Sequence, residues 1–463
     1  MSPESQGCPV DHAALGATAE KPAVPRWEGR VGQWSKVPGS ARMAWGLNYG
    51  LSRFGFAMAS RRGDPIARLT TDPVLRANPY PGYEDLRSRG RFVAGRFVTA
   101  TVDHEVARSI LRSPDFVTGG DAKPVQGRLT NAYYGLLDER HIGPIDQPSM
   151  LSVDGDLHLR YRRLVTRAFA ARSVAQQEDQ VREVSAQLLD SLEADGVRGF
   201  DLVERFAGQL PVAVIADMLG VHGADRDRLL AWGDGAAQLL DPDLTWRQYR
   251  SSIRDVRGLH DWFTDHVQHL RHRPDDSLLG RLVQLEGDDR LEEVELRAIG
   301  LLLLGAGFET TVNLISNAVA LLDAHPEQRA AASQDGWSGA IEETLRYEPP
   351  VQLTFRAART PTEIAGHRFE PGEGVLVMIA GANRDPAVFE DASTFDVRRE
   401  NAGEHLSLSH GAHYCVGANL AKLEGRVALE TLYGRFPELR VTDGAKRRPN
   451  RVLRGWERLP VAV

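Results

Sequence analysis

The sequence predicts a mainly α protein with minor β sheet, of the α+β class, and three observations lead to this prediction. Segments with apolar residues at helical spacing outnumber segments with strand-like alternation. One helical segment, residues 291–324, is longer than an average globular helix and contains the run Leu301–Leu304. The strand-like stretches are all short.

Apolar residues that recur every three or four positions define the helical segments. Examples, in chain order, are residues 158–172, 175–193, 202–219, 248–271, 291–324, 339–347 and 418–436. The leucine run in 291–324 is too short to span a bilayer, so we predict that this helix runs through the middle of a large core. Alternating apolar and polar residues predict strands within residues 92–99, 363–369 and 374–379.

Three regions are expected along the chain. Residues 1–40 are punctuated by prolines and lack apolar periodicity, which predicts a flexible N-terminal tail. Residues 41–77 predict an amphipathic N-terminal extension whose most apolar stretch, 43–58, is shorter than the roughly 20 residues of a membrane-spanning helix. This stretch either packs on the body or makes a peripheral membrane contact, and packing is the commoner outcome. Residues 78–463 predict one continuous domain without repeats or linkers.

Composition and charge restrict the possible functions. Hydrophobic residues make up 42% and charged residues 26% of the 463 residues, as in a globular protein in water. A net charge of −7 argues against nucleic acid as the partner, because phosphate binding needs a basic surface. The two cysteines, Cys8 and Cys415, are far apart, and residues 1–40 contain no secretory signal, so we expect no disulfide framework and a cytoplasmic location.

The segment Ser407-Leu-Ser-His-Gly-Ala-His-Tyr-Cys-Val-Gly417 brackets one cysteine with two glycines. Glycines allow a tight loop to approach a flat ligand closely. A helix predicted from Ala418 would direct its free N–H groups and positive dipole end at the Cys415 sulfur and favour the thiolate. A lone cysteine is also often just a small buried residue. A zinc site of His410, His413 and Cys415 is a further alternative, although a fourth ligand at the usual spacing is missing.

The predicted long helix contains Ala306-Gly-Phe-Glu-Thr310. A glycine and a charged Glu309 are unfavourable inside an apolar helix. Thr310 can donate a hydrogen bond to the carbonyl of Ala306, which loosens the helix and opens a groove. Taken alone, this motif also fits a purely local packing role.

Two charged pairs lie at helical spacing. Glu343 and Arg346 are three residues apart and share one helix face, a pattern that is also common on surfaces. His158 and Arg162 lie one helical turn apart and can point the same way. Each of these residues alone would be an ordinary charge.

Taken in order, these motifs resemble the cytochrome P450 family. The loop Gly411-x-His413-x-Cys415-x-Gly417 is similar to the family's heme-binding loop, with Leu408 in place of the usual aromatic residue. The stretch 382–386, Ala-Asn-Arg-Asp-Pro, is typical of bacterial members. The resemblance extends from about residue 78 to the C-terminus, and residues 1–77 exceed the usual bacterial core.

The resemblance implies the cytochrome P450 fold, in which a long central helix lies over a heme and the Cys-ligand loop lies on the other side. It implies heme b (iron protoporphyrin IX) with an axial thiolate from Cys415. Glu309 and Thr310 match the family's catalytic acid–alcohol pair, which supplies protons for oxygen activation. The other residues implied to bind the cofactor are His158, Arg162, Ala306, Arg356, His413 and Gly417. Glu343, Arg346 and Arg399 match a structural lock of the core.

By resemblance, the activity is that of a heme-thiolate monooxygenase that inserts one atom of dioxygen into a C–H bond of a small, lipophilic substrate. Electrons from NAD(P)H would arrive through a ferredoxin reductase and a ferredoxin. A basic face for an acidic ferredoxin is expected from Arg160, Arg163, Arg167, Lys422 and Arg426, unless these are simply solvated helix faces. The implied substrate pocket is lined by the segment after Val117, Leu302, Gly305, Ala306, residues 351–354 and the region near Leu453.

Three other classes of function remain open at this point. A peroxide-driven peroxygenase would more naturally lack the pair Glu309 and Thr310. A non-catalytic heme sensor would have no use for that pair. A zinc protein without heme is the third alternative.

Overall fold

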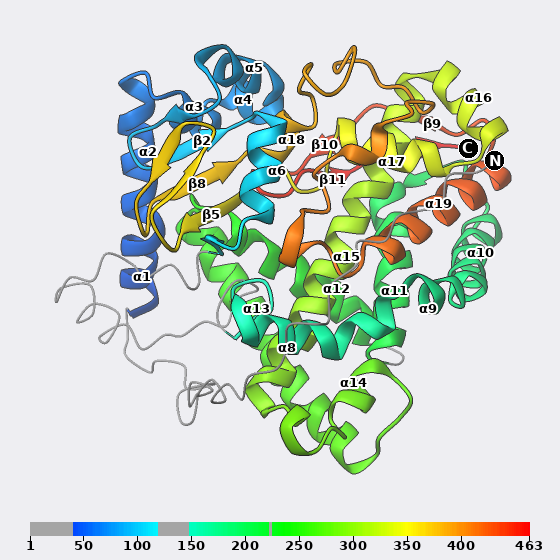
Figure 1. The fold of residues 1–463 in the computed structure, drawn as a ribbon. Coiled ribbons are helices and arrows are strands. Elements are labelled where there is room, and N and C mark those ends of the chain that lie inside the picture. Colours follow the sequence, from blue (N-terminus) through cyan, green and yellow to red (C-terminus); the bar gives the residue numbers. More distant parts are fainter. Residues whose placement is uncertain (1–39, 119–147, 222–224) are drawn as a thin grey trace, which may run out of the picture.

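The computed structural model describes residues 40–118, 148–221 and 225–463, and the tail predicted for residues 1–40 lies outside this range except for Ser40. Helices dominate and the sheets are small, which confirms the predicted class (Figure 1). The described helices are α1 (Ser40–Trp45), α2 (Leu51–Arg61), α3 (Pro65–Thr71), α4 (Pro73–Ala77), α5 (Tyr80–Arg89), α6 (His104–Arg112), α8 (Gly155–Thr166), α9 (Ala171–Ala175), α10 (Glu178–Ala194), α11 (Gln209–Met218), α12 (Asp225–Ala237), α13 (Trp246–His272), α14 (Leu278–Leu282), α15 (Glu293–Ala324), α16 (Pro326–Asp335), α17 (Ser338–Tyr347), α18 (Ile379–Ala382) and α19 (Ala418–Arg435).

The largest sheet lies beside the N-terminal helices (Figure 1). Its strand order is β1 (Val93–Ala94), β2 (Thr99–Thr101), β8 (Gly374–Val377), β5 (Thr354–Ala358) and β3 (Phe116–Val117). A three-stranded sheet joins β4 (Gly199–Asp201), β12 (Pro460–Ala462) and β9 (Arg440–Val441). Two hairpins pair β6 (Thr362–Ile364) with β7 (His367–Phe369) and β10 (Lys446–Arg447) with β11 (Trp456–Arg458).

Helix α15 passes through the middle of the molecule, as predicted (Figure 1). It is the one helix of the described residues that is long and apolar enough to cross a membrane, but 72% of its most apolar stretch is buried inside the molecule. Gly300 lets α13 approach closely, because a Cβ there would lie 2.4 Å from the Phe263 ring. The length and apolar character of α15 therefore serve the core.

Two predicted helices are interrupted in the structure. Residues 158–172 form α8, a 3-10 turn at Arg167–Phe169 and the start of α9, because buried Phe169 turns into the core. Residues 202–219 begin with a π-helical turn at Val203–Ala207 before α11. Gly208 follows that turn, and a Cβ at this position would lie 2.7 Å from the Val203 carbonyl oxygen.

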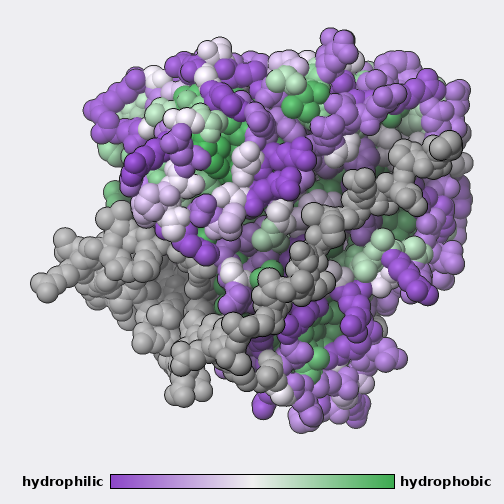
Figure 2. Space-filling view, in the orientation of Figure 1, coloured by the Kyte–Doolittle hydropathy of each residue, from purple (hydrophilic) through white to green (hydrophobic). Residues whose placement is uncertain are grey.

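Residues 40–61, the first part of the N-terminal extension, form one almost continuous helix, in which a π-helical turn (Gly46–Gly50) joins α1 to α2, and the short helices α3 and α4 follow. Trp45 donates from Nε1 to the carbonyl of Leu244, at 2.8 Å, and packs on Trp246. The packing predicted for residues 43–58 is therefore present on one side of this helix. The face of the molecule drawn in Figure 2 is largely hydrophilic, with smaller apolar patches between the elements.

Candidate active site

A tight loop presents Cys415 at the start of α19. We call residues 407–417 the Cys415 loop. Gly411 has φ +66°, and a Cβ there would lie 2.7 Å from the carbonyl oxygen of Leu111 at the end of α6. The Cys415 N–H donates to the Leu408 carbonyl at 2.8 Å, which closes the loop. Glycine at position 411 thus allows the loop to lie directly against α6.

The Cys415 sulfur lies in a mixed environment. Burial raises the pKa of its thiol, while the N–H of Gly417 and the charge of Arg162 oppose that rise. The first turn of α19 starts three residues later, so its positive end also favours an anionic sulfur. Leu408 is buried in the main hydrophobic core, and Cys415 packs against the same core.

Four of the residues expected to bind the cofactor lie together around Asp154. The rings of His158 and His413 stack with their centroids 4.1 Å apart, and His413 Nε2 lies 2.8 Å from Asp154 Oδ1. Burial, His413 and Arg162 lower the pKa of His158 to about 4, so this ring is neutral. Arg162 is the third member, because its charge affects the pKa of both His158 and Cys415. Arg356 is the fourth, because the charge of Asp154 affects its pKa.

Among the described residues, Arg162 and Arg356 have no counter-ion. Arg356 is only 6% exposed, and its hydrogen bonds go to the Thr354 hydroxyl and the Phe355 carbonyl. Burial lowers the pKa of Arg356 to about 10. No carboxylate of the described residues lies within ion-pair distance of either guanidinium. Since a buried arginine without a partner is costly, the site fits a bound group that carries carboxylates, as the propionates of heme would.

Helix α15 opens on one side at the predicted groove. Ala306 is exposed and Gly305, Gly307 and Thr310 beside it are half-buried, whereas Leu301–Leu304 are buried, and a Cβ on Gly305 would meet nothing within 4 Å. Thr310 donates from Oγ1 to the Ala306 carbonyl at 2.8 Å. The predicted back-bond and the open face therefore exist.

The carboxyl group of Glu309 has different neighbours from the hydroxyl of Thr310. It lies 3.3 Å from the guanidinium of Arg448, which also pairs with half-exposed Asp234 on α12. Asn313 donates to it at 3.4 Å. Burial raises the pKa of Glu309 to about 8, while the neighbouring Arg448 favours the charged form. A chain of polar groups thus leads from the surface at Asp234 to the residue beside Thr310.

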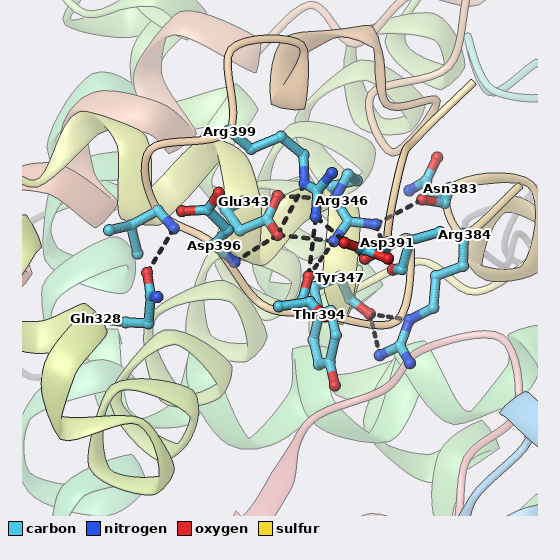
Figure 3. Close-up of polar contacts among 12 residues, drawn as sticks. Gln328, Glu343, Arg346, Tyr347, Asn383, Arg384, Asp391, Thr394, Asp396 and Arg399 are labelled. Atoms are coloured by element: carbon cyan, nitrogen blue, oxygen red, sulfur yellow. Dashed lines mark hydrogen bonds and ion pairs between the residues drawn. The ribbon is translucent and has the colours of Figure 1, made fainter. Parts of the chain in front are cut away.

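Figure 3 shows the group predicted to lock the core. Arg346 Nε and Nη2 donate to the two oxygens of Glu343, both at 2.7 Å, and both side chains are fully buried. Arg346 also donates to the carbonyls of Asn383, Ala392 and Thr394. Arg399 completes the group, with Nε 3.4 Å from Glu343 Oε1. The structure therefore brings the three predicted residues together.

The predicted basic docking face is largely paired. Arg160 donates to buried Glu295 at 2.9 Å, and Arg163 to Asp289 at 2.6 Å. The two cations that α19 contributes to the predicted face are also paired, Lys422 with Glu342 and Arg426 with Glu178. Sequence spacing could not show these partners, which come from distant elements. Of the five cations predicted for this face, only Arg167 is exposed and forms no ion pair with a described residue.

Several polar residues of the site were missed by the sequence analysis. Asp154 organises His413 and Thr118, and its only sequence signal is its place directly before a helix. Arg448 gives no local signal. Arg384 lies between the rings of Tyr80 and Tyr347, 3.4 and 3.6 Å from their centroids, a role that its stretch, residues 382–386, did not indicate.

The remaining sequence expectations have mixed outcomes. Among described residues, no group of three or more His, Cys, Asp or Glu side chains is arranged to hold a metal ion, which argues against the zinc alternative. Leu302 and Leu453 are buried, and Leu453 pairs with Val351 in an isolated bridge. Most of the pocket segment expected after Val117 lies outside the described residues.

Comparisons with known proteins agree with these observations. Residues 338–451 match the family model described as Cytochrome P450. The chain is 43% identical to the putative cytochrome P450 140 of Mycobacterium tuberculosis, over 91% of this chain and 97% of that protein. It is 35% identical to the cytochrome P450 monooxygenase PikC of Streptomyces venezuelae, over 83% and 91%. Among solved structures, P450BioI in complex with an acyl-ligated acyl carrier protein superposes with a TM-score of 0.77 at 30% identity, covering 85% of this chain and 100% of that one.

Proposed function

The chain belongs to the cytochrome P450 family and is a heme-thiolate monooxygenase, and from this premise we propose that Cys415 is the axial ligand and that the reaction inserts one oxygen atom of dioxygen into a C–H bond of a small, lipophilic substrate. The observation that carries the proposal is the convergence of Cys415, Arg162, Arg356 and the two stacked histidines in one buried site.

The residues assigned to the cofactor follow from their charges. Arg162, Arg356, His158 and His413 would hold the heme propionates, which supply the counter-ions that the two arginines lack among the described residues. Cys415 would give its thiolate to the iron, with the Gly417 N–H directed at the sulfur. When bound, a thiolate-ligated heme would supply the chemistry that activates dioxygen, using the electrons delivered to it.

Proton supply is assigned to the open side of α15. Thr310 holds its hydroxyl at the exposed face beside Ala306 and can pass a proton through a water molecule at that face. Glu309 would take up protons from the side of Arg448 and Asp234. Because burial raises the pKa of Glu309 to about 8, its carboxyl group can both hold and release a proton near neutral pH.

Electrons would come from NAD(P)H through a ferredoxin reductase and a ferredoxin. We place the docking face at Arg108 and Arg112 of α6, since this helix touches the Cys415 loop at Gly411. Both side chains are exposed and form no ion pair with any described residue. Burial and then the charges of these two arginines lower the pKa of His410 to about 4, which shows that positive charge is concentrated beside the loop. An acidic ferredoxin fits such a surface.

The substrate class is the least specified part of the proposal. Leu302, Gly305, Ala306 and the bridge of Val351 to Leu453 are apolar or small, which suits a lipophilic molecule. P450BioI, which has a similar fold, was solved with a hexadecenoyl chain on its carrier protein. The cytoplasm is the proposed location.

The decisive test replaces the ligand. The ferrous carbonyl complex of the full-length protein is expected to show the red-shifted Soret band of thiolate heme. Cys415→Ser should abolish this band, whereas Cys8→Ser, the matched change at the other cysteine, should leave it unchanged. An unaltered band in Cys415→Ser would show that Cys415 is not the ligand.

A further inference from the structure

The helix of the N-terminal extension has two different faces. Its inner face carries Trp45 and Tyr49, which pack on Trp246 and Tyr249 of the body. Its opposite face carries Met43, Leu47, Leu51 and Phe54, spaced four, four and three residues apart, as residues on one side of a helix are. In Figure 1 this helix stands at the left edge of the molecule, so its outer side is free of the body.

The outer face is exposed to an unusual degree. Met43 is 52%, Leu47 38%, Leu51 61% and Phe54 66% exposed. These four residues, which we call the outer face, include more than a third of the exposed large hydrophobic side chains in the described part of the chain. Such a concentration marks an interaction surface.

The charges on the helix that carries the outer face are all positive. Residues 40–62 contain Arg42, Arg53, Arg61 and Arg62 and no aspartate or glutamate. Arg53 has an acidic neighbour among the described residues, Asp243 at 4.0 Å. The whole chain, in contrast, has a net charge of −7. Positive charge is therefore concentrated where apolar side chains are exposed.

We propose that the outer face docks on the anionic surface of a lipid bilayer. An amphipathic helix with bulky apolar residues on one side and arginines beside them lies in the membrane interface, with the arginines at the headgroups. A second copy of this chain fits less well, because a two-fold contact would bring the same arginines together. Residues 1–39 fit less well too, since they contain four acidic and four basic residues and few large apolar ones.

The test is flotation of the full-length holoprotein with vesicles of phosphatidylcholine, either alone or with phosphatidylglycerol. We expect binding to the phosphatidylglycerol vesicles, weaker binding to phosphatidylcholine and a decrease at high salt. Leu51→Gln with Phe54→Gln should lower the partition coefficient about tenfold or more, because two large apolar side chains no longer enter the interface. Arg61→Gln with Arg62→Gln should remove mainly the part that depends on phosphatidylglycerol.

The matched control is Leu151→Gln with Leu159→Gln. Both leucines are exposed and lie away from the outer face, Leu151 just before α8 and Leu159 within it. This variant should bind vesicles like the wild type. The carbonyl spectrum and melting temperature of each variant show whether its fold is intact. Absence of vesicle binding by the wild type, or equal binding by the Leu51/Phe54 variant, would overturn the proposal. A dimer that the same variant dissociates, without vesicle binding, would assign the outer face to a second copy instead.

Discussion

Thr310 is the residue on which the proposed proton supply depends most directly. Thr310→Ala should retain heme and substrate binding, because the hydroxyl donates only to the Ala306 carbonyl and its loss removes no contact within the hydrophobic core. We expect NAD(P)H consumption to continue while hydroxylated product per NAD(P)H falls roughly tenfold and hydrogen peroxide rises, as for loss of a proton-transfer group. Parallel assays of NAD(P)H, peroxide and product measure this ratio.

The neighbouring threonine provides the control for this variant. Thr311 makes the same kind of back-bond, to the Gly307 carbonyl, but its side chain is buried. Thr311→Ala should lower stability and leave the product ratio unchanged, and Thr310→Ser should restore most of it. If Thr310→Ala and Thr311→Ala behave alike, the hydroxyl of Thr310 has only a structural role.

Glu424 on α19 is a buried carboxyl group with no use in the proposed reaction. Burial raises its pKa from 4.5 to about 8, so the folded protein binds a proton that the unfolded chain releases between these pH values. The free energy of unfolding should therefore decrease as pH rises through this window, by about 1.4 kcal/mol per pH unit. Glu424→Gln removes this contribution, and its stability relative to wild type should rise with pH until about pH 8.

Urea unfolding of both proteins at about pH 5.5 and 7.5 measures this difference. Glu438→Gln, at a side chain that is 85% exposed, is the control and should show the same difference at both pH values. An equal effect of Glu424→Gln at the two pH values would mean that the carboxyl group has a partner in solution or is ionised in the fold.

Residue identities could be predicted where the chemistry is local in sequence. The Cys415 loop and the back-bond of Thr310 lie within a few residues, so spacing alone predicted them. Asp154 and Arg448 could not be predicted, because their roles arise from partners about 260 and 140 residues away. The functional roles assigned to the site residues stay predictions until the variants are measured.

At the scale of elements, the group around Arg346 fixes α17 to the segment before the Cys415 loop. Arg346→Lys retains the charge but loses the planar fork that reaches both oxygens of Glu343 and three carbonyls (Figure 3). Disruption of a fully buried pair costs about 3–5 kcal/mol, so we expect a clear fall in melting temperature and in heme content. Thermal unfolding and the heme-to-protein absorbance ratio measure these effects.

The exposed pair of Arg368 and Glu370 is the matched control, with side chains 71% and 62% exposed. Arg368→Lys should change stability by less than about 1 kcal/mol, as is usual for surface pairs. A similar small effect of Arg346→Lys would show that the carbonyls, rather than the guanidinium geometry, hold the group together.

Element boundaries were predictable where one periodic pattern ran without interruption. Helices α13, α15, α17 and α19 begin and end within about two residues of their predicted bounds, a spread that differing definitions of helix ends also give. Helix α12 is not among the helices named from the sequence. Gly233 and Gly235 interrupt its pattern, and a Cβ at either position would collide with Phe308 or Asp255 of a neighbouring helix. Tertiary packing, rather than helix propensity, thus decides that segment.

Across the whole molecule, charge is distributed unevenly, and ferredoxin docking should follow that distribution. Arg108→Glu with Arg112→Glu should slow reduction by a ferredoxin by about tenfold at low salt, because steering charges raise association rates. The difference should shrink as salt increases, since exposed charges are screened over about 8 Å at physiological ionic strength. Stopped-flow reduction at several salt concentrations measures both effects.

Arg163→Glu is the control for this prediction, because Arg163 is already paired with Asp289 and belongs to the docking face that the sequence offered as one of two interpretations. A larger effect of Arg163→Glu than of the α6 variant would restore that earlier docking face. Sequence could predict that a basic face exists on an acidic protein, but not which arginines remain unpaired, since their partners lie on other helices.

The wide separation of the candidate heme-binding residues along the chain has a consequence for synthesis in the cell. His158 is made early, Arg356 about 200 residues later and Cys415 later still. Strand β12, residues Pro460–Ala462, pairs with β4, so the sheet begun at residue 199 also waits for residues made much later. A nascent chain that folds from its N-terminus therefore cannot complete this pocket before Cys415 has left the ribosome. Heme binding must come late in synthesis, and the heme available at that moment sets the active fraction of newly made protein.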